Sequence, residues 1–478
     1  MPELILGPVL GGLSASRVNL WGRTDSPAIL HAWIGRQPDL SDAQLAATSL
    51  PVSPENGFAG VATVNDLEPN REYHYALTLT EAHPPPHQAP YPKFTTFPPE
   101  NERTSYAFAF GSCFLPKGKD GGKIFNSIDE RRQQDNLRFI MMLGDQIYAD
   151  ADKHNGIGKI ASTLSEYRQV YTHTWTTPAF RQLMKQLPAF MILDDHEVDD
   201  DWTWTDFDRT RAQIPIWNRV MRALRLRPRD ERTLPLKRVQ DALQAYWEHQ
   251  GMHAPQMITP LSLDMNGQYA MPPGDPGSLA YTFTFGATAF FVLDTRTMRV
   301  KSWRGRSMLG KAQWVALERW LLAVKDRFPV KFIVSSCSLL FDLWIDIARD
   351  RWSGFPEERD RLLRFLGENN IQGVYVLAGD LHSAHAVRTE LYGPLDSTLA
   401  VWEFCSSPFE QTTNWLSSRT FRPIRTGPVK KQEPAFVVAK DNFGVIQVDF
   451  EGDATPSVYF RVYGKNGDLL AEVNGDNN

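Results

Sequence analysis

Residues 190–201 read FMILDDHEVDDD, in which four apolar residues run into eight residues that include six carboxylates and His196. Carboxylates this close together repel one another, and burial would force most of them to take up protons. The run is therefore either a solvated surface turn or a place where cations lie among the carboxylates. The apolar residues before it are typical of a short strand buried on both faces.

The chain after residue 103 repeats this pattern of an apolar run that ends in polar residues. The other runs are YAFAF (106–110) before GSC, FIMML (139–143) before GDQIYAD, FFVL (290–293) before DTR, FIVSS (332–336) before CS, and VYVLA (374–378) before GDLHSAH. Helical patterns lie between several of them. GKAQWVALERWLLAVKDR (310–327) places Trp314, Leu317, Trp320 and Leu321 on one face. Strands that alternate with helices predict an α/β layered core.

The first 80 residues have a different character, with short alternating runs separated by turn residues, which predict strands. Tyr73 and Tyr75 follow Leu67 and Pro69 in a pattern that resembles immunoglobulin-like and fibronectin-type sandwiches. In those folds a tyrosine near a corner bonds back to the backbone. The sequence therefore predicts an N-terminal β-sandwich domain over residues 1–80.

The remaining domain boundaries follow from composition. EAHPPPHQAPYP (81–92) is rich in proline, and we predict a linker over 81–103. The catalytic domain is predicted over 104–478, with an insertion around 202–275. That insertion is rich in Arg, Trp and Pro and holds one helical pattern, KRVQDALQAYWEHQ (237–250).

Composition excludes several classes of protein. The net charge of −5 gives no support to a surface for nucleic acid or for an anionic membrane, so an anionic substrate needs positive charge supplied locally. The three cysteines make a disulfide framework improbable. No run is long and apolar enough for a transmembrane segment. No signal peptide is seen at the start, so we expect a cytoplasmic protein, or a secreted one if the chain was trimmed.

The polar clusters after the apolar runs are the candidate site. In open α/β folds chemistry gathers at the carboxyl ends of strands, so we expect these clusters to lie close together. Their side chains mix carboxylates, imidazoles and a thiol, which are all metal ligands: Cys113, Asp145, Asp195, His196, Asp200, Asp380, His382 and His385. Each has a simpler interpretation, because Gly-Asp after a strand is usually a turn, Cys113 can be a small core residue and His385 can simply pack. Two cations that share carboxylates suit displacement at phosphorus.

Five motifs in this order resemble the PhoD-like alkaline phosphatases, a branch of the calcineurin-like metallophosphoesterases. They are GSC (111–113), GDQIYAD (144–150), EYRQVY (166–171), DDHEVDD (194–200) and AGDLHSAH (378–385). The resemblance covers nearly the whole chain, because that family also carries an N-terminal β-sandwich. It implies a catalytic domain of two β-sheets flanked by helices, with metals at the strand ends.

The resemblance also implies roles for single residues. Asp145 would bridge two metals, Cys113 would take the place of the Asp-x-His of most metallophosphoesterases, and Tyr167 would be an iron-binding phenolate. Fe³⁺ and Ca²⁺ are the expected cofactors, although the residues by themselves indicate only hard or borderline cations.

The remaining motifs supply further ligands and a catalytic group. Asp195, Asp380 and His382 match metal-binding positions, and His196 matches the histidine that assists the leaving group. Asp200 departs from the family, which often has asparagine there, and the twin-arginine signal of secreted members is absent.

These observations predict a metal-dependent hydrolase of phosphoric esters, a phosphomonoesterase or phosphodiesterase in which metal-activated hydroxide attacks phosphorus of a small-molecule substrate. His196 and Asp145 would be its catalytic residues. One alternative is a phosphodiesterase for nucleotides or lipid headgroups, with Trp202 and Trp204 in a lid formed by the insertion. Another is a calcium-stabilised binding protein, against which the thiol and imidazoles argue, because calcium prefers oxygen ligands.

Overall fold

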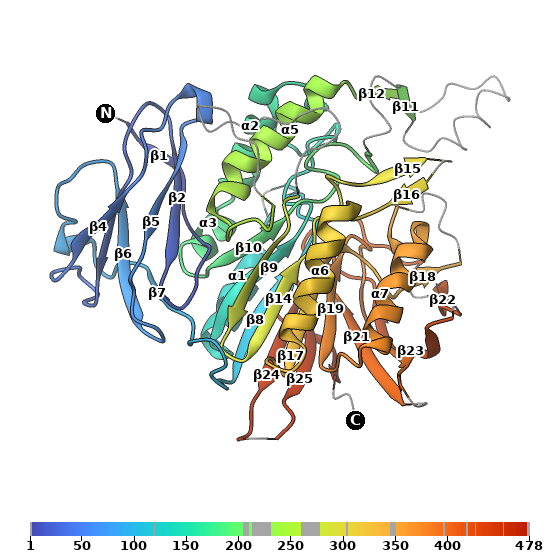
Figure 1. Ribbon diagram of the computed structural model, residues 1–478. Helices are drawn as coiled ribbons and strands as arrows, with labels where there is room; N and C mark the ends of the chain where they lie inside the picture. Colours follow the sequence, from blue (N-terminus) through green and yellow to red (C-terminus); the bar gives the residue numbers. More distant parts are fainter. Residues whose placement is uncertain are drawn as a thin grey trace.

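The computed structural model describes the chain except residues 1, 119, 204–209, 213–230, 260–277, 303–304, 345–349, 395–396, 417–418, 426, 453 and 476–478. Two large β-sheets lie face to face in its middle, helices cover their outer faces, and the N-terminal sheets lie on one side (Figure 1). The predicted α/β class and the two-sheet core flanked by helices are therefore confirmed.

The first large sheet has six strands. In spatial order they are β10 (Ala189–Ile192), β9 (Leu137–Leu143), β8 (Tyr106–Gly111), β24 (Asn442–Asp449), β25 (Ser457–Gly464) and β26 (Leu469–Asn474). β8, β9 and β10 run parallel to one another, whereas β24 to β26 are antiparallel. The carboxyl ends of β8 to β10 therefore meet at one edge.

The second large sheet has seven strands. In spatial order they are β13 (Tyr281–Phe285), β14 (Thr288–Val292), β17 (Val330–Cys337), β19 (Val374–Gly379), β21 (Thr398–Cys405), β20 (Ala384–Tyr392) and β23 (Val429–Val438). β14, β17, β19 and β21 are parallel. Each of the six apolar runs of the sequence lies on a strand of one of these sheets.

Three short pairs of strands complete the part of the chain beyond residue 103 that the structure describes. They are β11 (Thr210–Ala212) with β12 (Glu231–Thr233), β15 (Val300–Ser302) with β16 (Gly305–Ser307), and β18 (Asp342–Leu343) with β22 (Phe421–Arg422).

Aromatic side chains fill the space between the two large sheets. Phe108 and Phe139 of the first sheet stack at 4.7 Å between ring centroids, and Phe290 and Phe332 of the second stack at 5.0 Å. Phe108 meets Phe332 edge to face at 5.6 Å, which joins the two layers. Burying one such ring stabilises the fold by roughly 1.5–3 kcal/mol. This core fixes the position of the strand ends on which the site is built.

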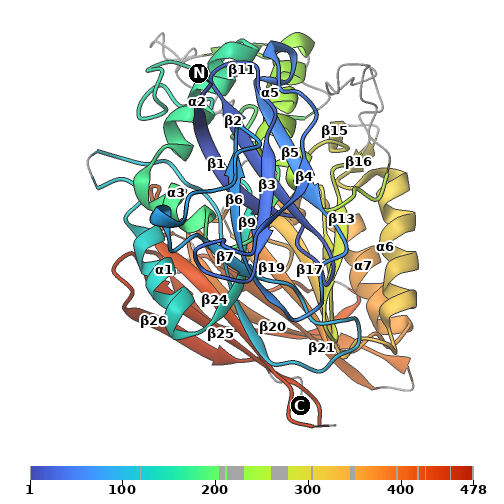
Figure 2. The same cartoon turned by 90° about the vertical axis from the view of Figure 1, so that its left-hand side faces the viewer.

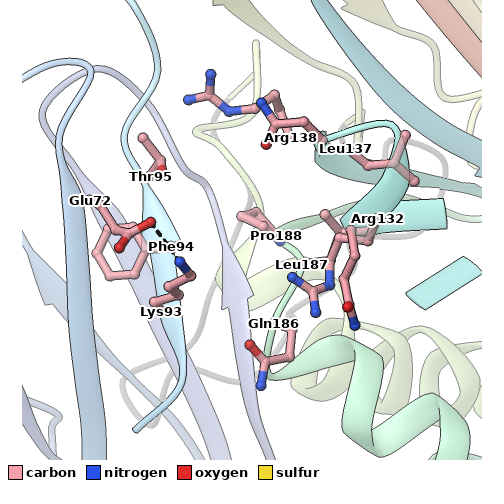
Figure 3. A pocket seen from close by; sticks show the side chains of 12 residues that line it. Glu72, Lys93, Phe94, Thr95, Arg132, Leu137, Arg138, Gln186, Leu187 and Pro188 are labelled. Atoms are coloured by element: carbon pink, nitrogen blue, oxygen red, sulfur yellow. Dashed lines mark hydrogen bonds and ion pairs between the residues drawn. The ribbon is translucent and has the colours of Figure 1, made fainter. Parts of the chain in front are cut away.

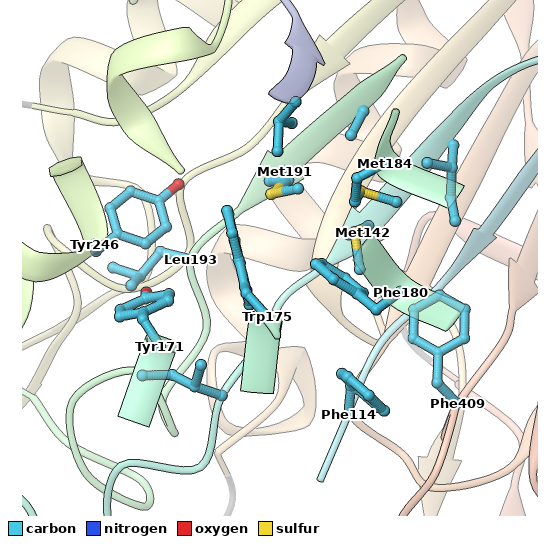
Figure 4. Packing of buried hydrophobic residues seen from close by; sticks show 14 of the residues in the cluster. Phe114, Met142, Tyr171, Trp175, Phe180, Met184, Met191, Leu193, Tyr246 and Phe409 are labelled. Carbon is cyan, nitrogen blue, oxygen red and sulfur yellow. The ribbon is translucent and has the colours of Figure 1, made fainter. Parts of the chain in front are cut away.

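Helices cover the outer face of each large sheet. α1 (Ile124–Gln134), α2 (Leu164–Trp175), α3 (Pro178–Met184) and α5 (Leu236–His249) lie on the six-stranded sheet, and α6 (Gly310–Val324) and α7 (Pro356–Glu368) lie on the seven-stranded one. Figure 4 shows Trp175 of α2 and Phe180 of α3 packed near Met142 and Met191 of the strands.

The two helices that the sequence predicted in most detail are confirmed. α6 buries Trp314, Leu317 and Leu321 and packs the partly buried Trp320 against the same core. α5 lies in the predicted insertion, and most of its side chains are buried.

Two smaller sheets form the N-terminal region, which faces the viewer in Figure 2. One joins β1 (Leu4–Gly11), β2 (Val18–Thr24) and β5 (Ala59–Val64), and the other joins β4 (Gln44–Thr48), β3 (His31–Gly35), β6 (Glu72–Thr78) and β7 (Lys93–Thr95). The hydroxyl of Tyr73 accepts a hydrogen bond of 3.0 Å from the backbone N–H of Glu68, which is the kind of corner contact that the sequence suggested. The immunoglobulin-like assignment itself stays a prediction.

The N-terminal sheets are joined tightly to the rest of the molecule. Trp21 donates to the carbonyl of Glu248 at 2.8 Å, and Tyr75 donates to that of Lys185 at 2.9 Å. β7 falls inside the segment 81–103 predicted as a linker and pairs with β6. The division into a separate sandwich, a linker and a catalytic domain stays a prediction. Within the described residues, none of the helices is long and apolar enough to cross a membrane.

Candidate metal centre

The loops after β8, β9, β10 and β19 bring the candidate ligands together, with Asp195 and His196 in the loop after β10. Cys113 follows β8, Asp145 follows β9, and Asp380 and His382 follow β19. All four have left-handed backbone, with φ of 62°, 56°, 64° and 55° in that order. This conformation is uncommon outside glycine and is typical of strained functional sites.

Two glycines allow these loops to approach one another. A Cβ added to Gly144 would lie 2.4 Å from the Cβ of Asp194, and one added to Gly379 would lie 2.6 Å from Oγ of Ser112. Glycine in each Gly-Asp pair therefore lets the loop after β9 touch the loop after β10, and the loop after β19 touch the one after β8.

Asp145 lies at the centre of the arrangement. It belongs to three groups whose candidate ligand atoms all lie within 4.8 Å of one another: Cys113, Asp145 and His382; Asp145, Asp195 and His196; and Asp145, Asp194 and Asp380. One carboxylate shared between neighbouring groups suits two adjacent cations. A fourth group, Asp195, Asp201 and Asp350, includes two residues that sequence reasoning did not single out.

A tyrosine that sequence reasoning missed lies in this centre. The hydroxyl of Tyr148 is 3.3 Å from Oδ2 of Asp145 and 3.2 Å from Nε2 of His382, and its ring centroid is 4.1 Å from that of His196. The signal was present in the sequence, because Tyr148 lies in the same GDQIYAD motif as Asp145.

The iron-binding role that the resemblance gives Tyr167 stays a prediction. The buried hydroxyl of Tyr167 donates to the carbonyl of Val198 at 3.0 Å, and burial raises its pKa, against the nearby charge of Arg238. The geometry thus favours Tyr148 as the phenol beside the ligands. Asp200 is in none of the four groups, and its backbone N–H donates to Asp150 at 3.0 Å.

His196 is held by a second carboxylate. Its Nδ1 lies 2.8 Å from Oδ1 of Asp150, and its backbone N–H donates to Asp145 at 3.3 Å. Burial acts to lower the pKa of His196, but the charges of Asp150, Asp145 and Asp195 together raise it well above its usual value. The contact with Asp150 orients the ring and leaves Nε2 as the nitrogen that can face a substrate.

Asp195 pairs with Arg296 at 3.6 Å and accepts from the backbone N–H of Asp201 at 2.7 Å, and three further acids of the opening run also have protein partners. Asp194 pairs with the buried Arg296 and accepts from Oγ of Ser336 at 2.9 Å, and Asp199 pairs with Arg238 at 3.0 Å. The third, Glu197, is described next.

Glu197 joins the loops after β9 and β10. It accepts from the backbone N–H groups of Asp145 at 3.1 Å, Gln146 at 2.8 Å and Asp194 at 3.1 Å, and from the side chain of Gln250 at 3.1 Å. Gln250 directly follows α5, so this part of the predicted insertion contacts the loops of the centre, and the lid stays a prediction. Trp202 is buried, and Trp204 lies outside the described residues.

His385 and the other cysteines do not belong to the centre. His385 is buried with its Nε2 2.8 Å from Oε1 of Glu403, and Cys337 and Cys405 are buried and not in disulfides. A pocket beside Arg138 and Pro188 lies at the starts of β9 and β10, the opposite edge of the sheet from the ligands (Figure 3).

The sequence model of the PhoD-like phosphatases matches residues 108–458, which is most of the chain. The chain belongs to the PhoD-like phosphatase family. Its similarity to alkaline phosphatase D of Bacillus subtilis (strain 168) is 25% identity over 354 residues, covering 67% of this chain. The chain spans about half of that relative, 52% of its length.

Solved structures show the same fold. The structure titled "Structure of PhoD" superposes with a TM-score of 0.66 at 19% identity, covering 98% of this chain and 92% of that one. Purple acid phosphatase PPD1 of yellow lupin (Lupinus luteus) superposes with a TM-score of 0.59 at 12% identity, covering 99% and 74%.

The electrostatics of this PhoD-like centre fit cations. Burial raises the pKa of Asp145 well above its usual value, that of Asp380 to about 8 and that of Cys113 to about 12. Oδ1 of Asp195 and Oδ2 of Asp194 are buried without a hydrogen bond. Bound cations would supply the positive charge that these ionised ligands lack and would engage the unsatisfied oxygens.

Proposed function

We propose that this PhoD-like protein is a metal-dependent hydrolase of phosphate esters. The observation that carries the proposal is the single carboxylate Asp145, shared by three groups of candidate ligands. Carboxylate, imidazole and thiol ligands around one shared carboxylate suit two adjacent cations.

The residues divide the work between holding cations and moving a proton. Cys113, Asp145, Asp195, Asp380 and His382 would hold the cations. When bound, these supply Lewis acidity toward the phosphoryl oxygens and activate water. His196, oriented by Asp150, donates a proton to the leaving oxygen from Nε2.

The identity of the cations belongs to the same proposal. We propose iron at the part of the centre that contains Cys113, because a thiolate and a phenolate both donate charge to ferric iron, and calcium beside the carboxylates. The phenolate of the sequence-based prediction was Tyr167. The distances of Tyr148 to Asp145 and His382 support Tyr148 instead.

A calcium-stabilised binding protein is the alternative from another class. Calcium prefers oxygen ligands, whereas this centre contains Cys113 and His382. A purely structural calcium site also has no need for a histidine oriented by a second carboxylate.

The proposal is tested with 4-nitrophenyl phosphate and bis(4-nitrophenyl) phosphate, each with and without a chelator. We expect hydrolysis that is lost on chelation and restored by added cation. The ratio of the two rates separates a phosphomonoesterase from a phosphodiesterase. A protein that binds cations stoichiometrically but hydrolyses neither ester would instead be the binding protein.

A further inference from the structure

A pocket lies at the edge of the seven-stranded sheet opposite the candidate metal centre. It is formed where β17, β19 and β21 begin, and its volume is about 700 Å³. Lys331 of β17, Tyr375 of β19 and Thr398 of β21 are among the residues that line it. β19 begins at Val374 on this edge and ends one residue before Asp380. A strand rises about 3.3 Å per residue, so the pocket lies roughly 20 Å from the candidate ligands and is a separate site.

Lys331 is a buried amine in the wall of this pocket. The residue is 1% exposed, and its Nζ donates to the carbonyl of Gln372 at 2.9 Å. Within the described residues, no carboxylate oxygen lies within 4.0 Å of this nitrogen. Burial lowers the pKa of Lys331 to about 8, against the charge of Asp326. An ammonium has three protons to donate, and a buried charge without a counter-ion is costly. An anion from solution would remove that cost.

The pocket carries an excess of positive charge. Arg103 and Lys325 line it together with Lys331, and Asp326 is the one carboxylate among the described residues that line it. Arg103 donates to the carbonyl of Ala454, which is a neutral group. In the part of the chain that the structure describes, neither Arg103 nor Lys325 has a carboxylate oxygen within 4.0 Å of its charged group. Three cations against one carboxylate leave two positive charges unbalanced.

Neutral hydrogen-bond donors lie beside these cations. The hydroxyl side chains of Thr455 and Ser457 and the amide side chains of Asn370 and Gln372 also line the pocket. An oxyanion has several acceptor oxygens and can accept from charged and neutral donors together. The lining therefore disfavours a cationic ligand and fits an oxyanion with two negative charges.

We propose that this pocket is a second anion site, in which Lys331, Arg103 and Lys325 bind a dianionic oxyanion of the phosphate class. Hydrogen bonds from charged donors to phosphate oxygens are roughly twice as strong as those between neutral groups. The anion supplies the counter-charge that the protein does not place beside Lys331. Free phosphate and the phosphoryl group of a monoester share this chemistry. The site goes beyond the proposed hydrolysis, because none of the candidate metal ligands lines it.

Competitive labelling measures the site at Lys331 itself, whatever binds at the metal centre. N-acetoxysuccinimide, a small neutral reagent, transfers its acetyl group to unprotonated amines, and peptide mass spectrometry gives the rate at each lysine of the cation-loaded protein. A bound anion covers Lys331 and favours its protonated form. At constant pH and ionic strength, saturating phosphate should therefore slow acetylation of Lys331 at least about fivefold, which corresponds to about 1 kcal/mol. Lys237 of α5, outside the pocket, should keep its rate. Benzylphosphonate in place of phosphate shows whether the site also accepts a monoester.

Variants of the lining show whether the protection of Lys331 comes from this pocket. Arg103→Met and Lys325→Met should each raise the half-protecting phosphate concentration about fivefold, because each removes one cation. Arg327→Met is the matched control, since Arg327 pairs with Glu100 at 3.1 Å and does not line the pocket. Lys331 that is not acetylated, acetylation that phosphate does not slow, or an equal shift in Arg327→Met overturns the proposal. No ester hydrolysis is measured, so failure of the proposed function leaves this result intact.

Discussion

Asp350 and Asp145 are both buried acids of the same site region, yet their electrostatics are opposite. Burial acts to raise the pKa of both carboxyls. Around Asp350 the charges of Arg296, Arg299 and Lys301 outweigh burial and hold its pKa well below the usual value. Around Asp145 the neighbours are Cys113, Asp195 and Asp194, which raise its pKa further, against only His196. The protein thus neutralises one acid with its own cations, whereas the other is the acid at which we propose that cations from solution bind.

The largest effect is expected at the acid without protein cations. Asp145→Asn should lower hydrolysis by at least ~10³-fold, about 4 kcal/mol, because it weakens every cation that the carboxylate shares. The fold should persist, since Asp145 sits in a loop that Glu197 holds through the backbone. Turnover and metal content are measured on the same purified variant. Wild-type values for both would show that the centre is assigned to the wrong residues.

Removing a cation that the protein itself places beside Asp350 should lower the stability of the fold rather than only the activity. Arg296→Met leaves Asp194 and Asp350 buried with less positive charge, and breaking a buried pair costs about 3–5 kcal/mol. Urea unfolding of the cation-loaded protein measures the loss. Glu318→Gln, which removes a more exposed pair with Arg361 at 2.7 Å, is the matched control and should cost less than about 1 kcal/mol. An equal loss of unfolding free energy in both variants would show that the buried pairs of Arg296 stabilise the fold no more than an exposed pair does.

We propose that His196 donates a proton to the leaving oxygen. Its loss should therefore impair that proton transfer rather than the binding of cations. His196→Ala should reduce turnover by about 10²-fold for alkyl phosphates and far less for 4-nitrophenyl phosphate, because an acidic phenol needs little protonation. The slope of log(kcat/KM) against leaving-group acidity is the measurement. A uniform loss along the series would indicate that His196 only holds or orients the centre.

The smallest expected effect is spectroscopic and separates the two tyrosines. A thiolate and a phenolate bound to ferric iron give the protein a visible absorption band, and Tyr148→Phe and Cys113→Ser should shift it. Tyr167→Phe should leave the band in place, since Tyr167 bonds to Val198 outside the ligand groups. Absorption spectra with metal analysis decide this. A shift in Tyr167→Phe but not in Tyr148→Phe would restore Tyr167 as the ligand, whereas active protein free of iron would remove iron from the proposal.

Much of the candidate centre could be predicted because strand ends carry a local signal. The runs that became β8, β9, β10 and β19 are apolar throughout, and the Gly-Asp and Asp-His pairs follow them directly. Parallel strands of one sheet must then bring the residues after β8, β9 and β10 to one edge. The packing of the two large sheets brings the loop after β19 to the same place. Position after a strand could not decide whether Tyr148 or Tyr167 is the phenol of the centre, because each lies within one of the five motifs. Only the distance from each hydroxyl to the candidate ligands distinguishes the two tyrosines.

The sequence by itself indicated most of the residues that could bind cations, the layered core and the family, since apolar periodicity and motif order are properties of the chain. Only the tertiary structure decided which acids are already neutralised. Arg296 lies 102 residues from Asp194, and Gln250 lies 53 residues from Glu197, so neither pairing leaves a local pattern. A buried charge is balanced by whatever the fold places within a few ångströms, and sequence separation carries no information about that distance.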